Sequence, residues 1–220
     1  RNRLGSYNAR FNVLLDPKFL KILDKALIKE GLGEIFKIAL IKSEELFDKI
    51  EKSASNLLQG DFYNKAQGKL ILSQSLRLML EEIHENPEED ILRRSVDFGH
   101  TFSPLVEMES VSNASYRRLP HGYAVAYDCL LSSVISNIRG KLSDSDLSRI
   151  FNLYLIFDFD LSNSIYMDHD LMWASVLEMT KHRGNNQHIP VPTGIGQFCF
   201  IEDLTYDELK IAKKHLSNFF

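Results

Sequence analysis

Apolar residues recur at steps of three and four along most of this chain, which is the period of a helix that buries one face. Between these stretches lie short runs of polar residues, glycine and proline, which favour turns. The pattern therefore predicts a mainly α-helical domain. Helices are expected over residues 17–28, 34–50, 70–84, 121–138, 143–157, 168–180 and 205–218, with another beginning near Ile91.

The stretch over residues 121–138 differs from the other helices, because small and apolar residues occupy nearly every position. This composition predicts a helix that is buried on most sides. Gly140 should end it. Polar, irregular connections are expected over residues 106–118 and 181–187.

Two or three short strands complete the prediction. Residues 11–15 form an apolar run that ends at Asp16 and Pro17, which suit the N-cap and the first turn of a following helix. A second strand is expected at 198–201, after a turn at 194–196 that contains two glycines. Because no third glycine or helix follows these two in the required place, a turn is favoured over a nucleotide-binding loop.

Composition narrows the class of protein. With 44% hydrophobic residues in 220, the chain can bury a substantial core, and its net charge of −4 gives no basic surface for nucleic acid. No apolar run reaches the ~20 residues that span a bilayer. Cys129 and Cys199 lie in apolar surroundings, which favours two buried thiols in a reducing compartment, the cytoplasm, over a disulfide. Because the chain opens at Arg1, we expect it to continue a longer protein.

Candidate chemistry begins with two histidines. His100 follows a glycine and His121 precedes one, and glycine permits close backbone approach, so both could converge on one metal ion. A histidine in a long chain is nevertheless more often a hydrogen-bonded core or surface residue. Glu34 and Lys37 share one face of a predicted helix, where their spacing also suits an ordinary surface ion pair.

Three motifs together resemble the C-terminal domain of the sugar phosphate cyclases, the superfamily of 3-dehydroquinate synthase and 2-epi-5-epi-valiolone synthase. They are Gly-Leu-Gly-Glu-Ile-Phe-Lys at 31–37, Val-Asp-Phe-Gly-His-Thr-Phe-Ser-Pro at 96–104 and Leu-Pro-His-Gly-Tyr-Ala-Val-Ala at 119–126. The opening residues and the segment 182–192 also fall in order. The resemblance implies a helical metal- and substrate-binding domain over residues 1–220, a homodimer, and an NAD-binding domain N-terminal to this chain and not contained in it.

Carried over residue by residue, the resemblance assigns a divalent metal, zinc or cobalt, to Glu34, His100 and His121. One carboxylate and two imidazoles would leave the ion Lewis-acidic, with open positions for substrate oxygens. Lys37 would face the same cavity and stabilise a developing alkoxide. The implied activity is that of a carbon–oxygen lyase. A bound NAD oxidises a ring hydroxyl, phosphate is eliminated, the ketone is reduced again, and the opened enol closes by an intramolecular aldol reaction.

The same resemblance points to further residues that would meet the substrate. Arg93 and Asp97 are expected in the catalytic site together with Lys37. Substrate and phosphate contacts are expected from Asn2, Lys181, His182 and Arg183. The alternative for these cations is an exposed, solvated polar turn.

Three positions at which this chain differs from the dehydroquinate synthases indicate the substrate. Those enzymes carry a second histidine where this chain has Pro104, an asparagine where it has Asp97, and a carboxylate-binding lysine where it has Met79. A methionine cannot pair with a carboxylate. The chain therefore resembles the valiolone synthase and desmethyl-4-deoxygadusol synthase branch, which acts on sedoheptulose 7-phosphate, and the valiolone side is slightly preferred. Tyr123 is less expected beside His121, where it could alter the hydrogen bonding of that ring.

Three other functions stay open from the sequence. The chain could belong to a 3-dehydroquinate synthase, or to a metal-dependent alcohol or glycerol dehydrogenase. The dehydrogenase is disfavoured because that family places a histidine four positions after its first ligand, and this chain has Ile38 there. It could also be a non-catalytic, metal-binding member of the cyclase family.

Overall fold

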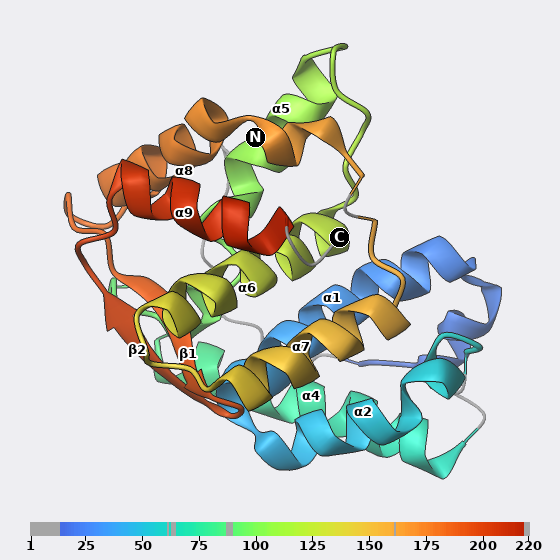
Figure 1. Ribbon diagram of the computed structural model, residues 1–220. Helices are drawn as coiled ribbons and strands as arrows, with labels where there is room; N and C mark the ends of the chain where they lie inside the picture. The colour runs from blue at the N-terminus through green and yellow to red at the C-terminus, as the bar shows by residue number, and fades with distance from the viewer. Residues whose placement is uncertain (1–13, 61, 63–64, 87–89, 161, 218–220) are drawn as a thin grey trace.

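The structure, a computed structural model, describes residues 14–60, 62, 65–86, 90–160 and 162–217. Helices dominate it, and the predicted mainly α-helical fold is confirmed (Figure 1). In chain order the elements are η1 (Pro17–Ile22), α1 (Lys25–Lys42), α2 (Glu44–Leu57), α4 (Ala66–Glu85), η2 (Ser95–Asp97), α5 (Ser103–Ser112), α6 (His121–Ile138), α7 (Asp144–Ile156), η3 (Ser164–Met167), α8 (His169–Lys181), β1 (Ile189–Gly194), β2 (Gln197–Ile201) and α9 (Tyr206–Ser217). In the described part of the chain, no helix is both long and apolar enough to cross a membrane.

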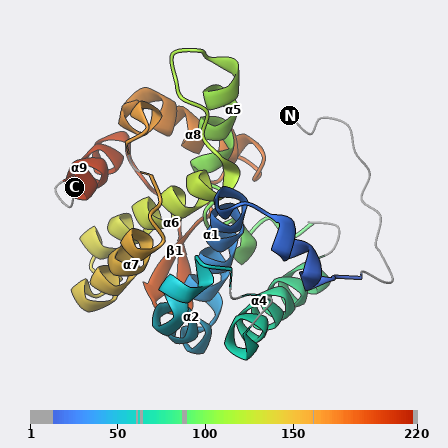
Figure 2. The same cartoon turned by 90° about the vertical axis from the view of Figure 1, so that its right-hand side faces the viewer.

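Helix α6 lies in the middle of the molecule. Helices α1, α5, α7 and α9 and the strand β1 pack around it (Figures 1 and 2). Nearly all of its residues are buried, including small ones such as Ala124 and Ser133 that let neighbouring elements approach. Gly140 follows its end with a φ of 67°, a conformation that suits glycine. The predicted helix, buried on most sides, is therefore confirmed.

Helices α1 and α6 cross at two glycines, and this contact positions the candidate site. A Cβ atom on Gly33 would lie 2.2 Å from the carbonyl oxygen of Gly122, and one on Gly122 would lie 2.0 Å from the carbonyl oxygen of Glu30. No side chain larger than hydrogen fits at either position without moving a backbone. The neighbours of these glycines in sequence, Glu34 and His121, are thereby brought close together.

The single helix predicted over residues 34–50 is two helices, because Ser43 interrupts it. Ser43 has an extended backbone, with φ −159° and ψ 106°, and its hydroxyl oxygen accepts a hydrogen bond from the N–H of Leu46 at 3.1 Å. A serine that bonds the backbone in this way starts a new helix. Apolar periodicity carries across the break, so the pattern alone did not predict it.

The helix predicted over residues 17–28 is also divided. Asp16 caps its N-terminus as predicted, but the element that it starts is the short η1. Asp24 then caps α1 through a second hydrogen bond from side chain to backbone. Of the strand predicted before them, residues 11–13 lie outside the described residues, and residues 14–15 are not in a strand.

Two predictions in the middle of the chain are wrong. No helix begins near Ile91 in the described residues. The side chain of Asn86 instead donates to the Ile91 carbonyl oxygen at 2.9 Å and accepts from its N–H at 3.1 Å. The loop expected over 106–118 is wrong in its first part, because residues 106–112 belong to α5. The N-terminus of this helix is held by Asp128 of α6. A partner so far along the chain leaves no local signal.

Strands β1 and β2 form an antiparallel hairpin, which confirms the strand predicted near the C-terminus. The N–H of Gly196 in its turn donates to the carbonyl oxygen of Leu40 in α1 at 2.7 Å. These glycines therefore form a tight turn against a helix, as predicted, and not a nucleotide loop. Cys129 is buried and Cys199 is half-buried, and both are free thiols, so the prediction of two buried thiols holds only for Cys129.

Candidate metal centre

Glu34, His100 and His121 come from three separate segments and meet beside the α1–α6 crossing; we call them the Glu-His-His cluster. One ligand atom from each lies within 4.8 Å of the other two. Nε2 of His121 is 3.0 Å from Oε1 of Glu34, and Nε2 of His100 is 4.0 Å from the same oxygen. The structure thus brings together the three residues expected to bind a metal.

Local structure explains how each side chain reaches the cluster. Glu34 lies within α1 and His121 begins α6, each beside one of the crossing glycines. His100 lies in the turn between η2 and α5. There Gly99 has a φ of 76°, and a Cβ atom on it would lie 2.9 Å from Sγ of Cys129. Glycine is therefore required next to each histidine, as the sequence suggested.

Lys37 stands one helical turn after Glu34 and completes the surroundings of the cluster. Its Nζ is 2.7 Å from Oε2 of Glu34, and 3% of the lysine side chain is exposed against 30% of the glutamate side chain. The ion pair suggested by the spacing is present, but the lysine is buried rather than on the surface. A buried ammonium needs a charged partner, and Glu34 provides it.

Burial, hydrogen bonding and charge shift the pKa values of the cluster residues in different directions. Burial alone would raise the pKa of Glu34, but the hydrogen bond from His121 and the charge of Lys37 outweigh it and hold the pKa at about 2. Burial, with the charge of Lys37, lowers the pKa of His100 to about 4. The hydrogen bond to Glu34 raises the pKa of His121 against the effect of burial. At neutral pH Glu34 is therefore an anion and His100 a neutral imidazole, the states that bind a cation.

The donor atoms fit a divalent metal such as zinc. Two imidazole nitrogens and one carboxylate oxygen form a ligand set that catalytic zinc sites use, with a further position left for water or substrate. The side chains of Glu34, His100 and His121 are 30%, 30% and 38% exposed, so solvent reaches the cluster. An ion at this place would replace the hydrogen that His121 Nε2 shares with Glu34.

Asp128 of α6 holds the segment that follows His100, and sequence analysis did not single it out. Its buried Oδ2 accepts hydrogen bonds from the N–H groups of Phe102 at 2.6 Å and Ser103 at 2.9 Å. These are donors that the start of α5, with Pro104 in its first turn, leaves unsatisfied. Burial raises the pKa of Asp128 to about 6, against the lowering effect of these hydrogen bonds.

Glu107 of α5 is a second residue that sequence analysis did not single out. Its Oε2 lies 2.8 Å from Nδ1 of His121, while Nε2 of the same ring faces Glu34. A glutamate on a polar stretch is usually solvated, so only the packing of α5 on α6 could reveal this contact.

Asp97 belongs to a separate group of ion pairs with Arg94 and Arg183, which we call the arginine cluster. Arg94 donates to both carboxylate oxygens, at 3.1 and 2.8 Å, and Arg183 lies 3.0 Å from Oδ2. Arg183 also donates to the carbonyl oxygen of His188 at 3.1 Å. Two residues expected to meet the substrate, Asp97 and Arg183, are therefore buried and paired with each other.

The other predicted substrate contacts lie in ion pairs of their own. Arg93 pairs with Glu202 at 3.3 Å. Lys181 and His182 are largely exposed and pair with a glutamate one turn back in α8. Asn2 lies outside the described residues. The structure thus brings Lys37 alone among the predicted cations into contact with the Glu-His-His cluster.

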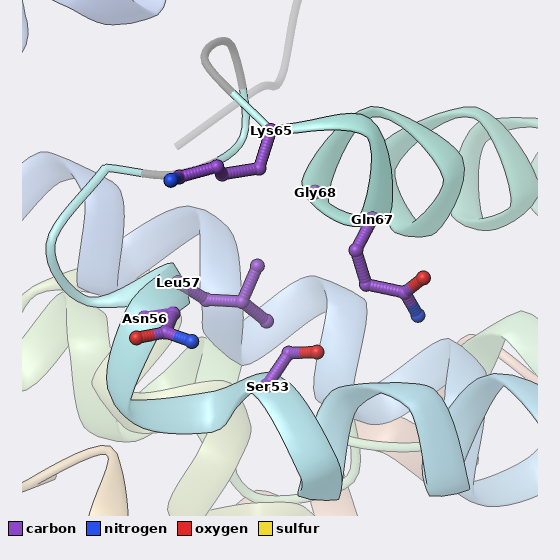
Figure 3. Close-up of a pocket in the computed structure, with 6 residues that line it drawn as sticks. All are labelled: Ser53, Asn56, Leu57, Lys65, Gln67 and Gly68. Atoms are coloured by element: carbon purple, nitrogen blue, oxygen red, sulfur yellow. The ribbon is translucent and has the colours of Figure 1, made fainter.

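A pocket of about 310 Å³ opens elsewhere, between the end of α2 and the start of α4 (Figure 3). It is lined by Ser53, Asn56, Leu57, Lys65, Gln67 and Gly68. These six residues include no acid, thiol or imidazole, so they offer no set of metal ligands. The candidate chemistry is concentrated at the Glu-His-His cluster.

Comparison with known proteins agrees with this arrangement. The family model for the C-terminal part of 3-dehydroquinate synthase matches residues 31–182. The chain belongs to this family. The resemblance predicted from three sequence motifs is thereby confirmed.

Curated relatives indicate the branch of the family. A 2-epi-5-epi-valiolone synthase of Streptomyces hygroscopicus subsp. jinggangensis is 38% identical over 96% of this chain, and a demethyl-4-deoxygadusol synthase of Trichormus variabilis is 31% identical over 96%. The chain spans about half the length of these relatives, 51% and 52%. These identities agree with the branch predicted from Asp97, Pro104 and Met79.

A solved structure shows the same fold. ValA, the 2-epi-5-epi-valiolone synthase of Streptomyces hygroscopicus subsp. jinggangensis, has NAD+ and Zn2+ bound and matches with a TM-score of 0.93 at 37% identity. The match covers 100% of this chain and 59% of ValA. The predicted helical domain of a dehydroquinate synthase-like fold is therefore confirmed.

Proposed function

We propose that this chain is the metal- and substrate-binding part of a sugar phosphate cyclase that converts sedoheptulose 7-phosphate to 2-epi-5-epi-valiolone. The observation that carries the proposal is the convergence of Glu34, His100 and His121 beside the buried Lys37. Family membership and sequence identity with valiolone synthases support the reaction class. NAD and zinc, which the similar ValA structure contains, are the proposed cofactors, and cobalt would suit the same ligands. On the family resemblance we further propose a cytoplasmic homodimer.

The residues at this site would have different roles. Glu34, His100 and His121 would hold the metal ion, which when bound supplies Lewis acidity beside a substrate hydroxyl, while NAD supplies a hydride acceptor. Glu34 is already an anion and His100 already neutral at pH 7. The ammonium group of Lys37 would stabilise negative charge on the reacting oxygen. Because Lys37 is buried, its position relative to Glu34 is well defined.

Three positions favour this substrate and reaction over the alternatives. Met79 of α4 packs partly buried against the core and offers no charge to a substrate carboxylate. Pro104 likewise has no side-chain hydrogen-bonding group where dehydroquinate synthases carry a histidine. Ile38 is buried, so the position at which alcohol dehydrogenases place a second ligand is occupied by the core.

The test is phosphate release by the full-length protein that contains this chain, supplied with NAD and zinc. Sedoheptulose 7-phosphate should release inorganic phosphate and give a cyclitol, whose mass distinguishes valiolone from deoxygadusol products. The sugar acid phosphate that dehydroquinate synthases use should not react. Turnover of that acid alone would overturn the substrate assignment, and net oxidation of a simple polyol without phosphate release would indicate a dehydrogenase instead.

A further inference from the structure

Both ring nitrogens of His121 meet carboxylates, but the two carboxylates lie in different surroundings. Nε2 is 3.0 Å from Glu34, within the Glu-His-His cluster, and Nδ1 is 2.8 Å from Glu107. The Glu107 side chain is 14% exposed, against 30% for Glu34. Glu107 therefore holds the ring from its protected side, away from the nitrogen that would meet a metal ion.

His100 shows a weaker form of the same arrangement. Its Nε2 is the nitrogen directed toward Glu34, and its Nδ1 is 3.4 Å from the carbonyl oxygen of Phe98. A short contact to a carboxylate holds an imidazole more strongly than a long contact to a neutral carbonyl. The orientation of His121 therefore depends on one side chain, Glu107, more than that of His100 depends on any.

Helix α5 fixes Glu107 and the approach to His121 as one unit. The hydroxyl of Ser110 donates to the carbonyl oxygen of Glu107 at 2.7 Å, and its oxygen accepts from the N–H of Leu119 at 3.0 Å. Ser110 and Leu119 are both buried. The carboxylate and the imidazole thus keep their relative positions.

We infer that Glu107 is a positioning residue for His121: it accepts the Nδ1 proton, sets the orientation of the ring and leaves Nε2 for the metal ion. The inference rests on the proposed function, because it concerns the ion that the Glu-His-His cluster would hold. A carboxylate behind a metal-binding imidazole also makes that imidazole a stronger ligand. Glu107 acts through His121 and has no contact with substrate in this scheme.

Zinc affinity of the full-length protein, measured by competition with a chromogenic chelator, tests this role. Glu107→Ala should weaken zinc binding by roughly 10- to 100-fold. Glu107→Gln should weaken it less, because its amide oxygen still accepts from Nδ1. Glu109→Gln, with the same loss of charge on the same helix, is the matched control and should leave affinity unchanged. With cobalt bound, the visible absorption bands should shift in Glu107→Gln and not in Glu109→Gln.

Two results would overturn the inference without touching the proposed function. One is equal zinc affinity and equal cobalt spectra in Glu107→Ala and Glu109→Gln. The other is a loss of affinity in Glu107→Ala that matches an equal loss of stability in the metal-free protein while the cobalt spectrum stays the same, since that would make Glu107 a structural residue only. Absence of zinc binding in the unsubstituted protein would instead refute the proposed function as well.

Discussion

The Glu-His-His cluster and the arginine cluster are built from similar charged residues but differ in how far they are closed. In the arginine cluster, Asp97 accepts hydrogen bonds from Arg94 and pairs with Arg183, and 8% of its side chain is exposed. In the Glu-His-His cluster, Glu34 pairs with Lys37 and still keeps 30% of its side chain exposed. One carboxylate is enclosed by fixed partners, whereas the other lies at an open surface with two imidazoles.

We therefore expect a structural role for the arginine cluster and, on the proposed function, a metal-binding role for the Glu-His-His cluster. A buried ion pair is costly to break, and the arginine cluster ties the segment before His100 to the turn after α8. An open carboxylate beside two imidazoles can exchange its hydrogen bonds for a metal ion. Substitutions in the arginine cluster should therefore change stability, and substitutions in the Glu-His-His cluster should change metal binding.

The largest effect is expected at the crossing that brings Glu34 and His121 together. Gly122→Ala would place a Cβ atom 2.0 Å from a backbone oxygen of α1, which forces the two helices apart. The free energy of unfolding, from urea denaturation, should fall by about 3 kcal/mol or more. Gly31→Ala is the matched control, because nothing lies within 4 Å of its added Cβ atom. It should gain roughly 0.5–1 kcal/mol as a helix-interior glycine replaced by alanine.

Asp97→Ala should have the next largest effect, on stability rather than on metal binding. It removes the carboxylate that lies between Arg94 and Arg183 and should cost about 3 kcal/mol in the free energy of unfolding. Asp97→Asn keeps the shape and one acceptor oxygen and should cost less. If Asp97→Ala weakened zinc binding with unaltered stability, Asp97 would act at the metal site. The structural role expected for the arginine cluster would then be wrong.

A pH-dependent effect is expected from Asp128, which supports the Glu-His-His cluster. Burial raises the pKa of its carboxyl from an ordinary 3.8 to about 6, so between these values the folded state binds the proton more tightly than the unfolded chain does. The stability that this group contributes is present below about pH 4 and is lost as pH rises through 6. The difference in unfolding free energy between the natural protein and Asp128→Asn should change by about 2–3 kcal/mol across this window. A difference that is constant from pH 4 to 7 would argue against the burial effect.

The smallest effect is expected at the polar turn after α8. Lys181 and Glu178 form an exposed pair one turn apart, so Lys181→Ala should change the free energy of unfolding by less than ~0.5 kcal/mol and leave zinc binding unaltered. The KM of the Lys181→Ala variant for the phosphorylated sugar, measured in the full-length protein, tests whether this turn meets the substrate. An increase in KM would place this turn at the substrate, as the sequence resemblance implied.

Much of the helical fold was predictable because local signals agree with the packing. The run of small and apolar residues at 121–138 predicted a helix buried on most sides, and Ser143 and Asp168, where two predicted helices begin, cap α7 and α8. Local signals failed where a distant partner decides the conformation. At the N-terminus of α5, the acceptor of the free N–H groups is Asp128, which comes from another helix.

The candidate site was predictable in composition but not in its supporting contacts. Resemblance named Glu34, His100 and His121, and glycine neighbours hinted that the two histidines could approach closely. Neither signal could show that Glu107 stands behind His121 or that Asp97 is enclosed by two arginines. Both contacts depend on which faces of the helices pack together, and this cannot be predicted from a single sequence.

The most direct test of the central claim is the zinc content of the full-length protein after dialysis, measured by mass spectrometry together with circular dichroism. We expect about one zinc ion per chain in the unsubstituted protein and in Lys181→Ala. We expect none in a folded His121→Ala variant, since two remaining ligands hold zinc poorly. A folded His121→Ala variant that retained its full zinc content would contradict the account.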